Sequence, residues 1–406
     1  MHPCRICSQP RITNWLDLGP QALTNRFLKS PTEADYLHPC KLGVCQACGT
    51  IQLESPVPVE EMRPHYDWIF YNEPEQHLDD FAAVLARLPG ITPQSSIGGI
   101  TYKDDSTLAR LNKLGFTNTW RAEMNADLGI PSPLAGIESV QAAMNPATTE
   151  RLLAKHSPVD LLLFRHVLEH SYDIHEVLRC VRSLVKPTGY IALEMPDARR
   201  AFDRLDYSTI WEEHIFYFTP TTLRRLFALA GLEVVFLESY HYTLENSLMV
   251  IARPLATSYP IPQSPQASVE DVERAERFIA QFPHVRDAYR QRLQRFRSEQ
   301  GTIAMLGAGH LSAAFLNFYE LADSIAFIVD DNTNKQGLFM PGSRVPILPA
   351  SALLERSSKL CLMSVRPEIE DTILKKNEAF IHNGGIIASV FPDSRYAFAS
   401  LNEAKA

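Results

Sequence analysis

The chain has 406 residues, more than one hydrophobic core usually organises, so two or three domains are expected. Hydrophobic residues make up 45% and charged residues 21% of the sequence, which excludes a largely disordered protein. The formal net charge of -8 at pH 7 argues against general binding to nucleic acid or anionic membranes, so a small molecule is the expected partner.

The N-terminal sequence, M-H-P-C-R-I-C, contains no apolar signal core. Apolar runs such as residues 161–164 are far shorter than a segment that spans a bilayer. We therefore expect a cytoplasmic protein with no membrane partner.

Four of the seven cysteines form two C-x-x-C pairs, Cys4 with Cys7 and Cys45 with Cys48. Each such turn presents two thiolates to one tetrahedral ion, so in a reducing compartment the pairs predict a closed structural zinc site. A redox pair or unrelated free thiols are the alternatives. Redox pairs of this spacing open a helix after a buried strand, however, and only three residues precede Cys4. The remaining cysteines lack such spacing and are expected to be spare: Cys40, Cys180 and Cys361.

Beyond the cysteine pairs, amphipathic helical stretches alternate with short strand-like runs, which is typical of an α/β domain with a doubly wound, parallel sheet. The expected helices cover residues 78–88, 107–114, 174–185 and 221–230, and the expected strands cover 160–164, 190–193, 232–237 and 247–252. Gly115 and Gly231 mark the ends of two of these helices.

Four prolines between Arg253 and Ser268 exclude a long helix or a central strand, so this stretch is expected to be a linker. A charged helix over 269–300 follows, and then a second α/β unit with strands over 302–306 and 326–331. The expected domains are 1–75 with the cysteine pairs, 76–253 with the central sheet, 254–300 with the linker and helix, and 301–400 with the second sheet.

The second α/β unit carries part of a dinucleotide-binding fingerprint. Gly307 and Gly309 follow a strand, Ala313 stands at the third glycine position, and Asp330 ends the next strand. Such glycines let a pyrophosphate approach a helix N-terminus, and the acid accepts hydrogen bonds from the ribose hydroxyls. The alternative is a tight turn that serves packing or holds part of a substrate.

Four motifs occur in a fixed order along the chain: the C-x-x-C pairs, R-H-V-L-E-H at 165–170, W-E-E-H-I-F-Y-F-T at 211–219, and G-A-G-H at 307–310 with V-D-D-N-T-N-K-Q-G-L-F-M-P-G at 329–342. In this order they resemble the S-adenosylmethionine-dependent C-methyltransferases of deoxysugar biosynthesis over nearly the whole chain. The resemblance implies a class I methyltransferase-type doubly wound sheet, a small N-terminal zinc-binding domain and a C-terminal Rossmann-like α/β domain. It also implies S-adenosylmethionine as cofactor and a nucleotide-linked keto-sugar, methylated beside its carbonyl, as substrate.

The resemblance maps the family's catalytic acid and histidine onto Glu213 and His214, and a further histidine onto His170. Removing a proton beside a carbonyl needs a base in a water-poor pocket, and the aromatic residues around this pair favour such a pocket. We predict that His214 is the base and that Glu213 orients it. Neighbouring residues of a helix point about 100° apart, so the segment is expected to be extended or turning. The alternative is two surface charges beside a core histidine.

One departure from the family pattern concerns a proton donor. The family commonly has a tyrosine two residues before the glutamate, where this chain has Trp211, and an indole does not exchange a proton in catalysis. Tyr217, Tyr207 or Tyr71 could take that place, and Tyr217 is the predicted catalytic residue among them.

For the cofactor, the resemblance implies a glycine-rich turn after the first strand of the central sheet and an acid at the end of the second. The corresponding turn is S-I-G-G-I-T-Y-K-D-D-S-T-L at 96–108, with no acid before its glycines. A plain turn in a domain that binds no cofactor is the alternative. Asp127 is the alternative to Glu123 as the ribose acid. The predicted cofactor contacts are Gly98, Gly99, Asp104, Glu123 and His166.

The sequence thus predicts a three-domain cytoplasmic methyltransferase that acts on a nucleotide-sugar-like small molecule and uses zinc structurally. Two other classes stay open: a binding or scaffold protein that kept the fold and lost the cofactor, and an oxidoreductase that binds NAD(P) in the G-A-G-H domain. The altered glycine turn and Trp211 favour the first of these two. No pattern in the sequence specifies the oligomeric state.

Overall fold

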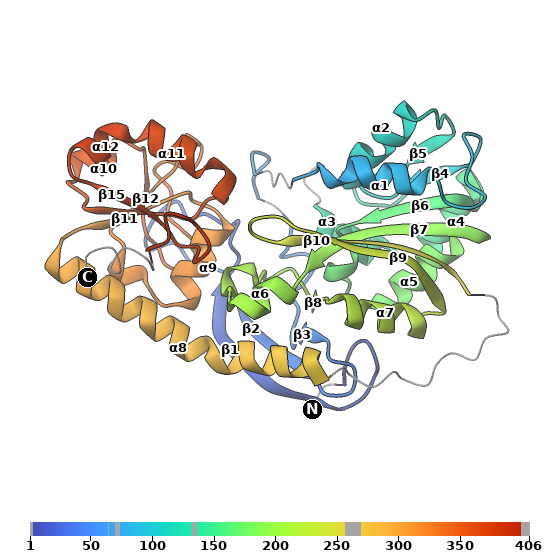
Figure 1. The fold of residues 1–406 in the computed structure, drawn as a ribbon, viewed down its shortest axis with the longest axis horizontal. Coiled ribbons are helices and arrows are strands. Elements are labelled where there is room, and N and C mark those ends of the chain that lie inside the picture. The colour runs from blue at the N-terminus through green and yellow to red at the C-terminus, as the bar shows by residue number, and fades with distance from the viewer. Residues whose placement is uncertain (1–2, 64, 70–73, 132–135, 256–268, 399–406) are drawn as a thin grey trace. The chain divides into compact units, whose positions relative to one another are not determined.

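The computed structural model describes residues 3–63, 65–69, 74–131, 136–255 and 269–398 (Figure 1). The chain divides into two compact units that interleave along the sequence. Unit 1 consists of Met1–Leu16, Lys41–Asp203 and Glu213–Ile279, and unit 2 of Asp17–Cys40, Arg204–Glu212 and Ala280–Ala406. The predicted linker falls mostly on residues 256–268, which lie outside the described residues, and the domain boundaries stay a prediction.

A six-stranded sheet forms the centre of unit 1, with the strand order β5-β4-β6-β7-β10-β9. Its strands are β4 (Ile97–Gly99), β5 (Thr119–Arg121), β6 (Val159–Arg165), β7 (Val185–Asp197), β9 (Leu232–Tyr240) and β10 (Asn246–Pro254). The neighbours among β5, β4, β6 and β7 pair in parallel, but β10 is antiparallel to both β7 and β9. The expectation of a purely parallel sheet is therefore wrong at β10. Only residues 241–245 join β9 to β10, and so short a connection cannot make the crossover that parallel pairing requires.

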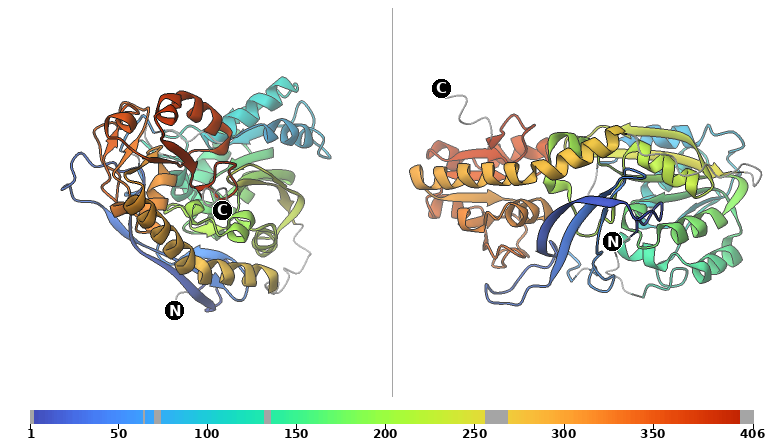
Figure 2. Two further views of the ribbon diagram at one scale, coloured as in Figure 1. Left: turned by 60° about the vertical axis from the view of Figure 1, so that its left-hand side comes forward. Right: turned by 90° about the horizontal axis from the view of Figure 1, so that it is seen from below.

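Helices cover both faces of this sheet (Figures 1 and 2). Successive residues of β6 point to opposite faces, so Leu161 and Leu163 pack with α1 and α2, whereas Leu162 and Phe164 pack on the opposite face with α4, α5 and α7. These helices and the short α3 and α6 are α1 (His77–Leu85), α2 (Asp105–Lys113), α3 (Ile137–Ala143), α4 (Pro146–His156), α5 (Ile174–Ser183), α6 (Arg199–Arg204) and α7 (Pro220–Leu229).

Local sequence explains where several of these helices begin. The Asn145 side chain accepts a hydrogen bond from the Thr148 amide, and Pro146 occupies the first turn of α4. Thr219 caps α7 in the same way before Pro220. These caps satisfy amide groups that a helix leaves without an internal partner.

A smaller sheet has the order β1-β2-β3-β8, in which β2 and β8 each pair antiparallel with β3. Its strands are β1 (Ile12–Ala22), β2 (Leu37–Cys45), β3 (Ile51–Leu53) and β8 (Phe216–Tyr217). Strand β3 pairs with β8 through Ile51 with Tyr217 and Gln52 with Phe216. A strand next to the cysteine pairs is thereby joined to the segment that carries His214.

Unit 2 contains a five-stranded parallel sheet with the order β13-β12-β11-β14-β15. Its elements are β11 (Ile303–Leu306), α9 (His310–Phe318), β12 (Phe327–Val329), β13 (Ile347–Leu348), α10 (Ala352–Glu355), β14 (Leu360–Met363), α11 (Glu370–Lys376), α12 (Glu378–His382) and β15 (Ile386–Ser389). This confirms the expected second α/β unit.

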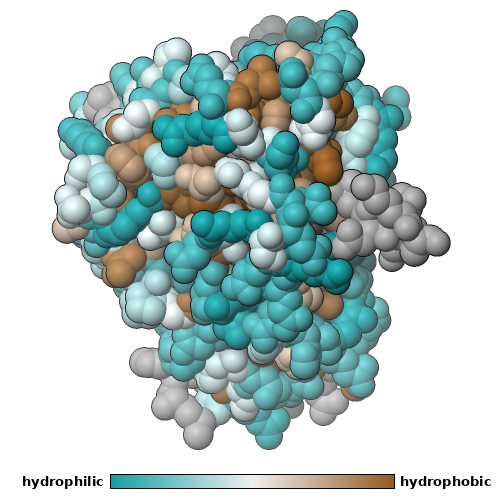
Figure 3. Space-filling model, turned by 90° about the vertical axis from the view of Figure 1, so that its left-hand side faces the viewer, coloured by the Kyte–Doolittle hydropathy of each residue, from teal (hydrophilic) through white to brown (hydrophobic). Residues whose placement is uncertain are grey.

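The surface seen from the left of Figure 1 is mostly hydrophilic, with apolar residues gathered in its upper part (Figure 3). Exposed large apolar side chains of unit 2 include Leu354, Ile369 and Ile381. Scattered apolar side chains of this kind are normal on a folded protein.

The expected charged helix is α8 (Val269–Glu299), with Pro283 inside it. Five short 3-10 turns complete the described elements: η1 (Tyr102–Asp104), η2 (Leu168–His170), η3 (Tyr207–Thr209), η4 (Ala322–Ser324) and η5 (Pro367–Ile369). Among the described helices, none combines the length and apolarity needed to cross a membrane.

Candidate functional site

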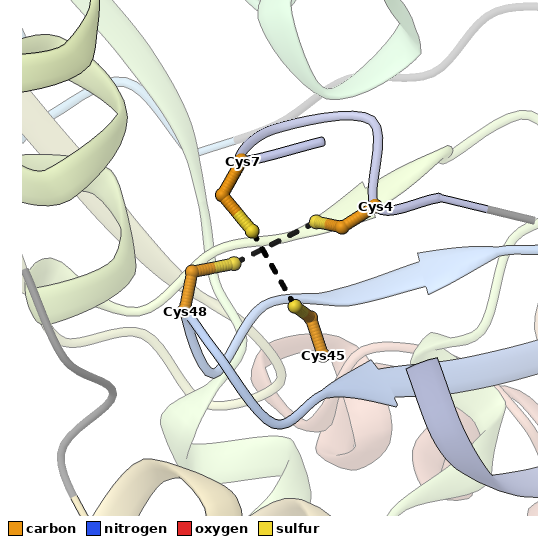
Figure 4. Close-up of side chains that lie close together, drawn as sticks. All are labelled: Cys4, Cys7, Cys45 and Cys48. Atoms are coloured by element: carbon orange, nitrogen blue, oxygen red, sulfur yellow. Dashed lines mark hydrogen bonds between the residues drawn. The ribbon is translucent and has the colours of Figure 1, made fainter. Parts of the chain in front are cut away.

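The two C-x-x-C pairs meet in unit 1 (Figure 4). The Cys4 and Cys48 sulfurs lie 3.7 Å apart, the Cys7 and Cys45 sulfurs lie 3.6 Å apart, and all four lie within 4.8 Å of one another. Four thiolates at about 2.3 Å from a zinc ion would be about 3.8 Å apart in a tetrahedron. The four cysteines therefore fit a closed zinc site, with no position left for a substrate.

Two hydrogen bonds favour the thiolate form of Cys4. The Gln52 side-chain amide donates to the Cys4 sulfur at 3.1 Å, and the Ile6 amide donates to the same sulfur at 3.4 Å. Cys40, by contrast, is buried within β2 outside this cluster, and burial raises the pKa of its thiol. A neutral, buried Cys40 is consistent with its expected role as a spare cysteine.

The zinc segment is tied to the central sheet within unit 1. The His175 imidazole bonds the Ile6 carbonyl at 2.8 Å, and the Arg225 guanidinium donates to the Cys48 carbonyl at 2.8 Å. The Leu53 amide donates to the Ile215 carbonyl at 2.9 Å, next to His214. The zinc site is therefore in a position to hold the His214 segment in place.

The central sheet has its topological switch point between β4 and β6, because the chain continues from β4 to β5 on one side and then returns to β6 on the other. In open α/β sheets, ligands bind outside the carboxyl ends of the strands at such a point. The loops after β4 and β6 carry most of the residues that the sequence singled out for the cofactor.

The protein's own side chains occupy the space beside the two glycines of the first loop. A Cβ atom on Gly98 would lie 2.5 Å from the Trp120 indole, and one on Gly99 would lie 2.9 Å from the Asp104 Cβ. The buried Asp104 carboxylate accepts hydrogen bonds from the amides of Ile100, Thr101 and Arg165. These residues fit a self-packed turn, so packing explains both glycines, and their contact with a cofactor stays a prediction.

A network of buried charged side chains contacts this loop through Arg165. The sequence did not reveal this network. The Arg165 guanidinium is 1% exposed and donates from Nε to Glu194 at 2.5 Å, while His77 Nε2 lies 2.7 Å from the other Glu194 oxygen. Burial opposes ionisation of Glu194, but the charges of Arg165 and His166 hold its pKa well below the ordinary value. The only sequence signals were a charged residue inside an apolar strand at Arg165 and another at Glu194.

His166 has a left-handed backbone conformation, with φ of +56°. Its Nδ1 atom lies 3.4 Å from Glu169 and its Nε2 atom 3.5 Å from Glu194. A non-glycine residue in this conformation is strained, and such strain concentrates at functional sites. The role of His166 near the cofactor stays a prediction, and this conformation is consistent with it.

The end of β5 distinguishes the two candidate ribose acids. Asp127 is buried, accepts a hydrogen bond from the Glu123 amide and binds Lys155 with both oxygens. The Glu123 carboxylate is largely exposed, 3.5 Å from the Lys155 ammonium. Glu123 is thus the better placed of the two to accept hydrogen bonds from a ligand.

The histidines singled out by the resemblance come together in unit 1. His170 and His214 are buried, their ring centroids lie 4.8 Å apart, and the His170 Nδ1 atom bonds the Glu213 carbonyl oxygen at 3.0 Å. The Ile215 amide donates to the Glu169 carbonyl at 2.8 Å and fixes the two segments together. Residues 211–215 form no helix, as expected.

The Glu169 carboxylate, which is 1% exposed, also lies with these imidazoles. Glu169 stands inside the R-H-V-L-E-H motif but was not among the predicted site residues, and the role of Glu213 stays a prediction. Tyr217 is also buried, with its ring centroid 6.2 Å from that of His214. Tyr71 lies outside the described residues.

Trp211 and Tyr207 belong to unit 2, where each has aromatic neighbours. The Trp211 indole stacks on His310 with ring centroids 3.4 Å apart, and Tyr207 packs edge-on against Phe282 and Tyr319. Burial raises the pKa of Tyr207, so its hydroxyl holds its proton more strongly than a tyrosine in water. These contacts give both side chains a packing role in unit 2.

The G-A-G-H loop of unit 2 binds its own residues. The Ala308 amide donates to Asp330 at 2.7 Å, and the Lys335 ammonium donates to the Ala308 carbonyl at 2.6 Å. His310, the first residue of α9, is buried, bonds Thr24 and the Ser208 carbonyl, and burial lowers its pKa to about 3. The amide and the acid that a dinucleotide would need are engaged inside the protein, which favours the packing role of this turn.

The parallel strands, the antiparallel β10 and the switch point between β4 and β6 are those of the class I S-adenosylmethionine-dependent methyltransferase fold. Three family descriptions match the chain in order: a zinc binding domain at residues 4–62, a methyltransferase domain at 58–237 and a C-methyltransferase C-terminal domain at 261–392. The chain belongs to the C-methyltransferase family that combines these three domains, with S-adenosylmethionine as cofactor and zinc at its N-terminus.

A relative extends this likeness over the whole chain. The C-methyltransferase NovU of Streptomyces niveus is 25% identical, and the match covers 97% of this chain and 96% of that protein. Among solved structures, the 1,6-didemethyltoxoflavin-N1-methyltransferase of Burkholderia thailandensis is 12% identical with a TM-score of 0.30, covering 45% of this chain and 80% of that one. The magnesium protoporphyrin IX methyltransferase of Synechocystis PCC 6803 is 13% identical with a TM-score of 0.30, covering 44% and 82%. The family assignment rests on the domain matches and on the full-length relative.

We expect the Cys45→Ser variant to lose the thiolate-bound zinc and to destabilise the N-terminal segment, because metal binding and folding are coupled in small zinc modules. The measurement is the zinc released by a mercurial thiol reagent, one equivalent per chain in the parent protein. Cys40→Ser is the control and should release the same amount as the parent. Equal release from Cys45→Ser and the parent would contradict the four-cysteine site.

We expect unit 2 to lose stability as the pH falls from about 6.5 towards 3, because burial lowers the His310 pKa to about 3. In this range the unfolded chain binds a proton that the folded chain does not, so this one group destabilises the fold by up to about 1.4 kcal/mol per pH unit. Urea unfolding of parent and His310→Phe at several pH values measures the effect. The substitution should flatten the pH dependence, whereas the exposed control His382→Gln should not.

We expect Glu123→Ala to weaken binding of S-adenosylmethionine by about 1.5–3 kcal/mol, the usual cost of losing a hydrogen bond to a charged group. Calorimetric titration of the cofactor measures this loss. Asp127→Asn, at a carboxylate already bound to Lys155, should change stability more than affinity. Unchanged affinity in Glu123→Ala would show that the ribose is bound elsewhere.

Proposed function

We propose that this C-methyltransferase methylates the carbon beside the carbonyl of a nucleotide-linked keto-sugar or a similar small molecule. The resemblance of the four motifs to deoxysugar C-methyltransferases supports the substrate class. The single observation that carries the proposed chemistry is the buried group of Glu169, His170 and His214, at the segment where the resemblance places the base.

Carbon methylation beside a carbonyl begins with the removal of a weakly acidic proton, and a positioned base does this best in a water-poor pocket. His170 and His214 are 5% and 8% exposed, so little water reaches either ring. One member of the Glu213–His214 pair removes the proton, and the other member orients that base. The Tyr217 hydroxyl is proposed to stabilise the substrate oxygen on which negative charge develops.

S-adenosylmethionine supplies the methyl group when it is bound. On this chain, Glu123 is proposed to hold the ribose, and the loops after β4 and β6, including His166, are proposed to hold the rest of the cofactor. The four thiols of the zinc cluster require a reducing compartment, which supports a cytoplasmic location. The Ala308 amide donates a hydrogen bond to the Asp330 carboxylate, so neither group is available to a dinucleotide. This argues against the alternative of an NAD(P)-dependent oxidoreductase.

We expect the enzyme to exchange the proton beside the carbonyl of a keto-sugar nucleotide in deuterated water, even when S-adenosylhomocysteine blocks methyl transfer. Exchange precedes methylation and needs the base but no methyl donor. His214→Ala should reduce exchange by about 10²–10⁴-fold, the range for loss of a positioned base. Deuterium incorporation, followed by NMR, is the measurement.

Glu213→Gln separates the roles within the pair. A smaller loss than in His214→Ala means that the carboxylate orients the imidazole, and a larger loss means that the carboxylate is the base. His241→Ala, at an exposed histidine, is the control and should exchange like the parent. Undiminished exchange in both His214→Ala and Glu213→Gln would leave this segment with a structural role only.

A further inference from the structure

Three polar side chains of unit 1 form a hydrogen-bonded chain that the proposed reaction does not use. They are His77, the first residue of α1, Glu194 in β7, and Tyr242 in the loop between β9 and β10. The His77 Nε2 atom lies 2.7 Å from a Glu194 oxygen, and the His77 Nδ1 atom lies 2.6 Å from the Tyr242 hydroxyl. One buried imidazole therefore connects a buried carboxylate to a phenol.

The loop that carries Tyr242 lies at the edge of the central sheet where ligands bind. Strand β10 begins by pairing Asn246 with Asp197, the last residue of β7, so residues 241–245 lie beside the carboxyl end of β7. In open α/β sheets, ligands bind outside the carboxyl ends of the strands. Glu194 also lies 3.5 Å from His166, in the loop after β6 that is predicted to hold the cofactor. The phenol is thus on the ligand-binding side of the sheet.

The charge of Glu194 fixes which His77 nitrogen carries a proton. Burial opposes ionisation of Glu194, but the Arg165 guanidinium, 2.5 Å away, holds the Glu194 pKa well below the ordinary value. An ionised carboxylate only accepts hydrogen bonds, so the Nε2 atom of His77 carries the proton. A neutral imidazole then has its lone pair on Nδ1.

The Tyr242 hydroxyl therefore points its only proton at His77. The Nδ1 atom accepts this hydrogen bond, and burial raises the pKa of Tyr242, so the phenol keeps its proton. The His77 backbone amide donates to the same phenol oxygen at 3.2 Å. Tyr242 is half-buried, and its oxygen can accept one further hydrogen bond. Towards a ligand, this hydroxyl is an acceptor.

We propose that Tyr242 binds a hydroxyl group of the substrate and selects substrates that carry one, with His77 and Glu194 as the residues that position its proton. This inference rests on the proposed function for the substrate class, a sugar that bears hydroxyl groups. The substrate hydroxyl donates to the Tyr242 oxygen, and no covalent bond is made or broken. A carbonyl or enolate oxygen would face lone pairs here, so the segment around His214 keeps the chemistry proposed for it.

Nitrogen NMR of the full chain with labelled histidine tests the proton positions without any ligand. We expect a neutral His77 ring with its proton on Nε2, and the signals that vanish in His77→Phe identify this ring. In Tyr242→Phe the Nδ1 resonance should shift, because the nitrogen loses its hydrogen bond. A proton on Nδ1 in the parent would overturn the proposal.

Tyr240→Phe is the matched control for this measurement. The Tyr240 ring also packs on His77, with ring centroids 5.3 Å apart. Loss of the Tyr240 hydroxyl should leave the Nδ1 resonance of His77 in place. An equal shift in both variants would assign the effect to ring packing and refute the hydrogen bond from Tyr242.

Binding of keto-sugar nucleotides tests the selection. The probes are one such nucleotide and its analogues that each lack one sugar hydroxyl, titrated by calorimetry in the presence of S-adenosylhomocysteine. The parent should bind one analogue about 5–10-fold more weakly than the full nucleotide, a typical loss for one hydrogen bond. Tyr242→Phe should bind these two probes equally, whereas Tyr240→Phe should discriminate as the parent does. Equal weakening of every probe in Tyr242→Phe would overturn the proposal.

His77→Phe tests the positioning role. Without the Nδ1 acceptor, the Tyr242 proton can turn towards the ligand, so discrimination should fall although the phenol is still present. A merely structural role of His77 would weaken all probes alike. Circular dichroism reports that the variant is folded, and full discrimination in the folded variant would refute the positioning role.

The two measurements separate this inference from the proposed function. A proton on Nε2 of His77, in a parent that binds none of the nucleotides and exchanges no deuterium, would support the acceptor assignment and reject the proposed function. Deuterium exchange in the parent, with discrimination that survives in Tyr242→Phe, would support the function and reject the role of Tyr242.

Discussion

The pairing of β3 with β8 is the interaction on which the site of unit 1 depends. Strand β3 directly follows the second cysteine pair, and β8 directly follows His214. The bond from the Leu53 amide to the Ile215 carbonyl and the register of Gln52 with Phe216 join the two. The pairing of β3 with β8 is only two residue pairs long, so a metal-bound turn that fixes β3 would also help to position the His214 segment.

Buried charge is the second constraint on this unit. Arg165, Glu194 and His77 satisfy one another at the carboxyl ends of β6 and β7, and His166 connects this network to Glu169. Both carboxylate oxygens of Glu169 are buried without a hydrogen bond from a described residue. In a low-dielectric interior such a carboxylate carries a large desolvation cost, which a proton or a positive charge beside it would reduce.

Unit 2 also has a candidate ligand site, the G-A-G-H turn, but there the polar groups bond one another. Its glycine turn has the geometry that binds a dinucleotide in other proteins, yet Asp330 bonds the Ala308 amide and His310 is buried against Trp211. The Ala308 amide and the Asp330 carboxylate, which a dinucleotide would contact, are thus bonded to each other. A fingerprint indicates a fold, whereas the partners of its polar groups decide whether a ligand can bind.

The sequence by itself determined the features that depend on local spacing. C-x-x-C turns, helical periodicity and proline positions predicted the zinc cluster, most helices and the α/β class, because each pattern acts over a few residues. The tertiary structure alone decided that β10 runs antiparallel, that Trp120 and Asp104 fill the space beside Gly98 and Gly99, and that Glu169 lies with His214. Those facts depend on contacts between residues far apart in the chain, and the sequence pattern carries no record of which distant side chains meet.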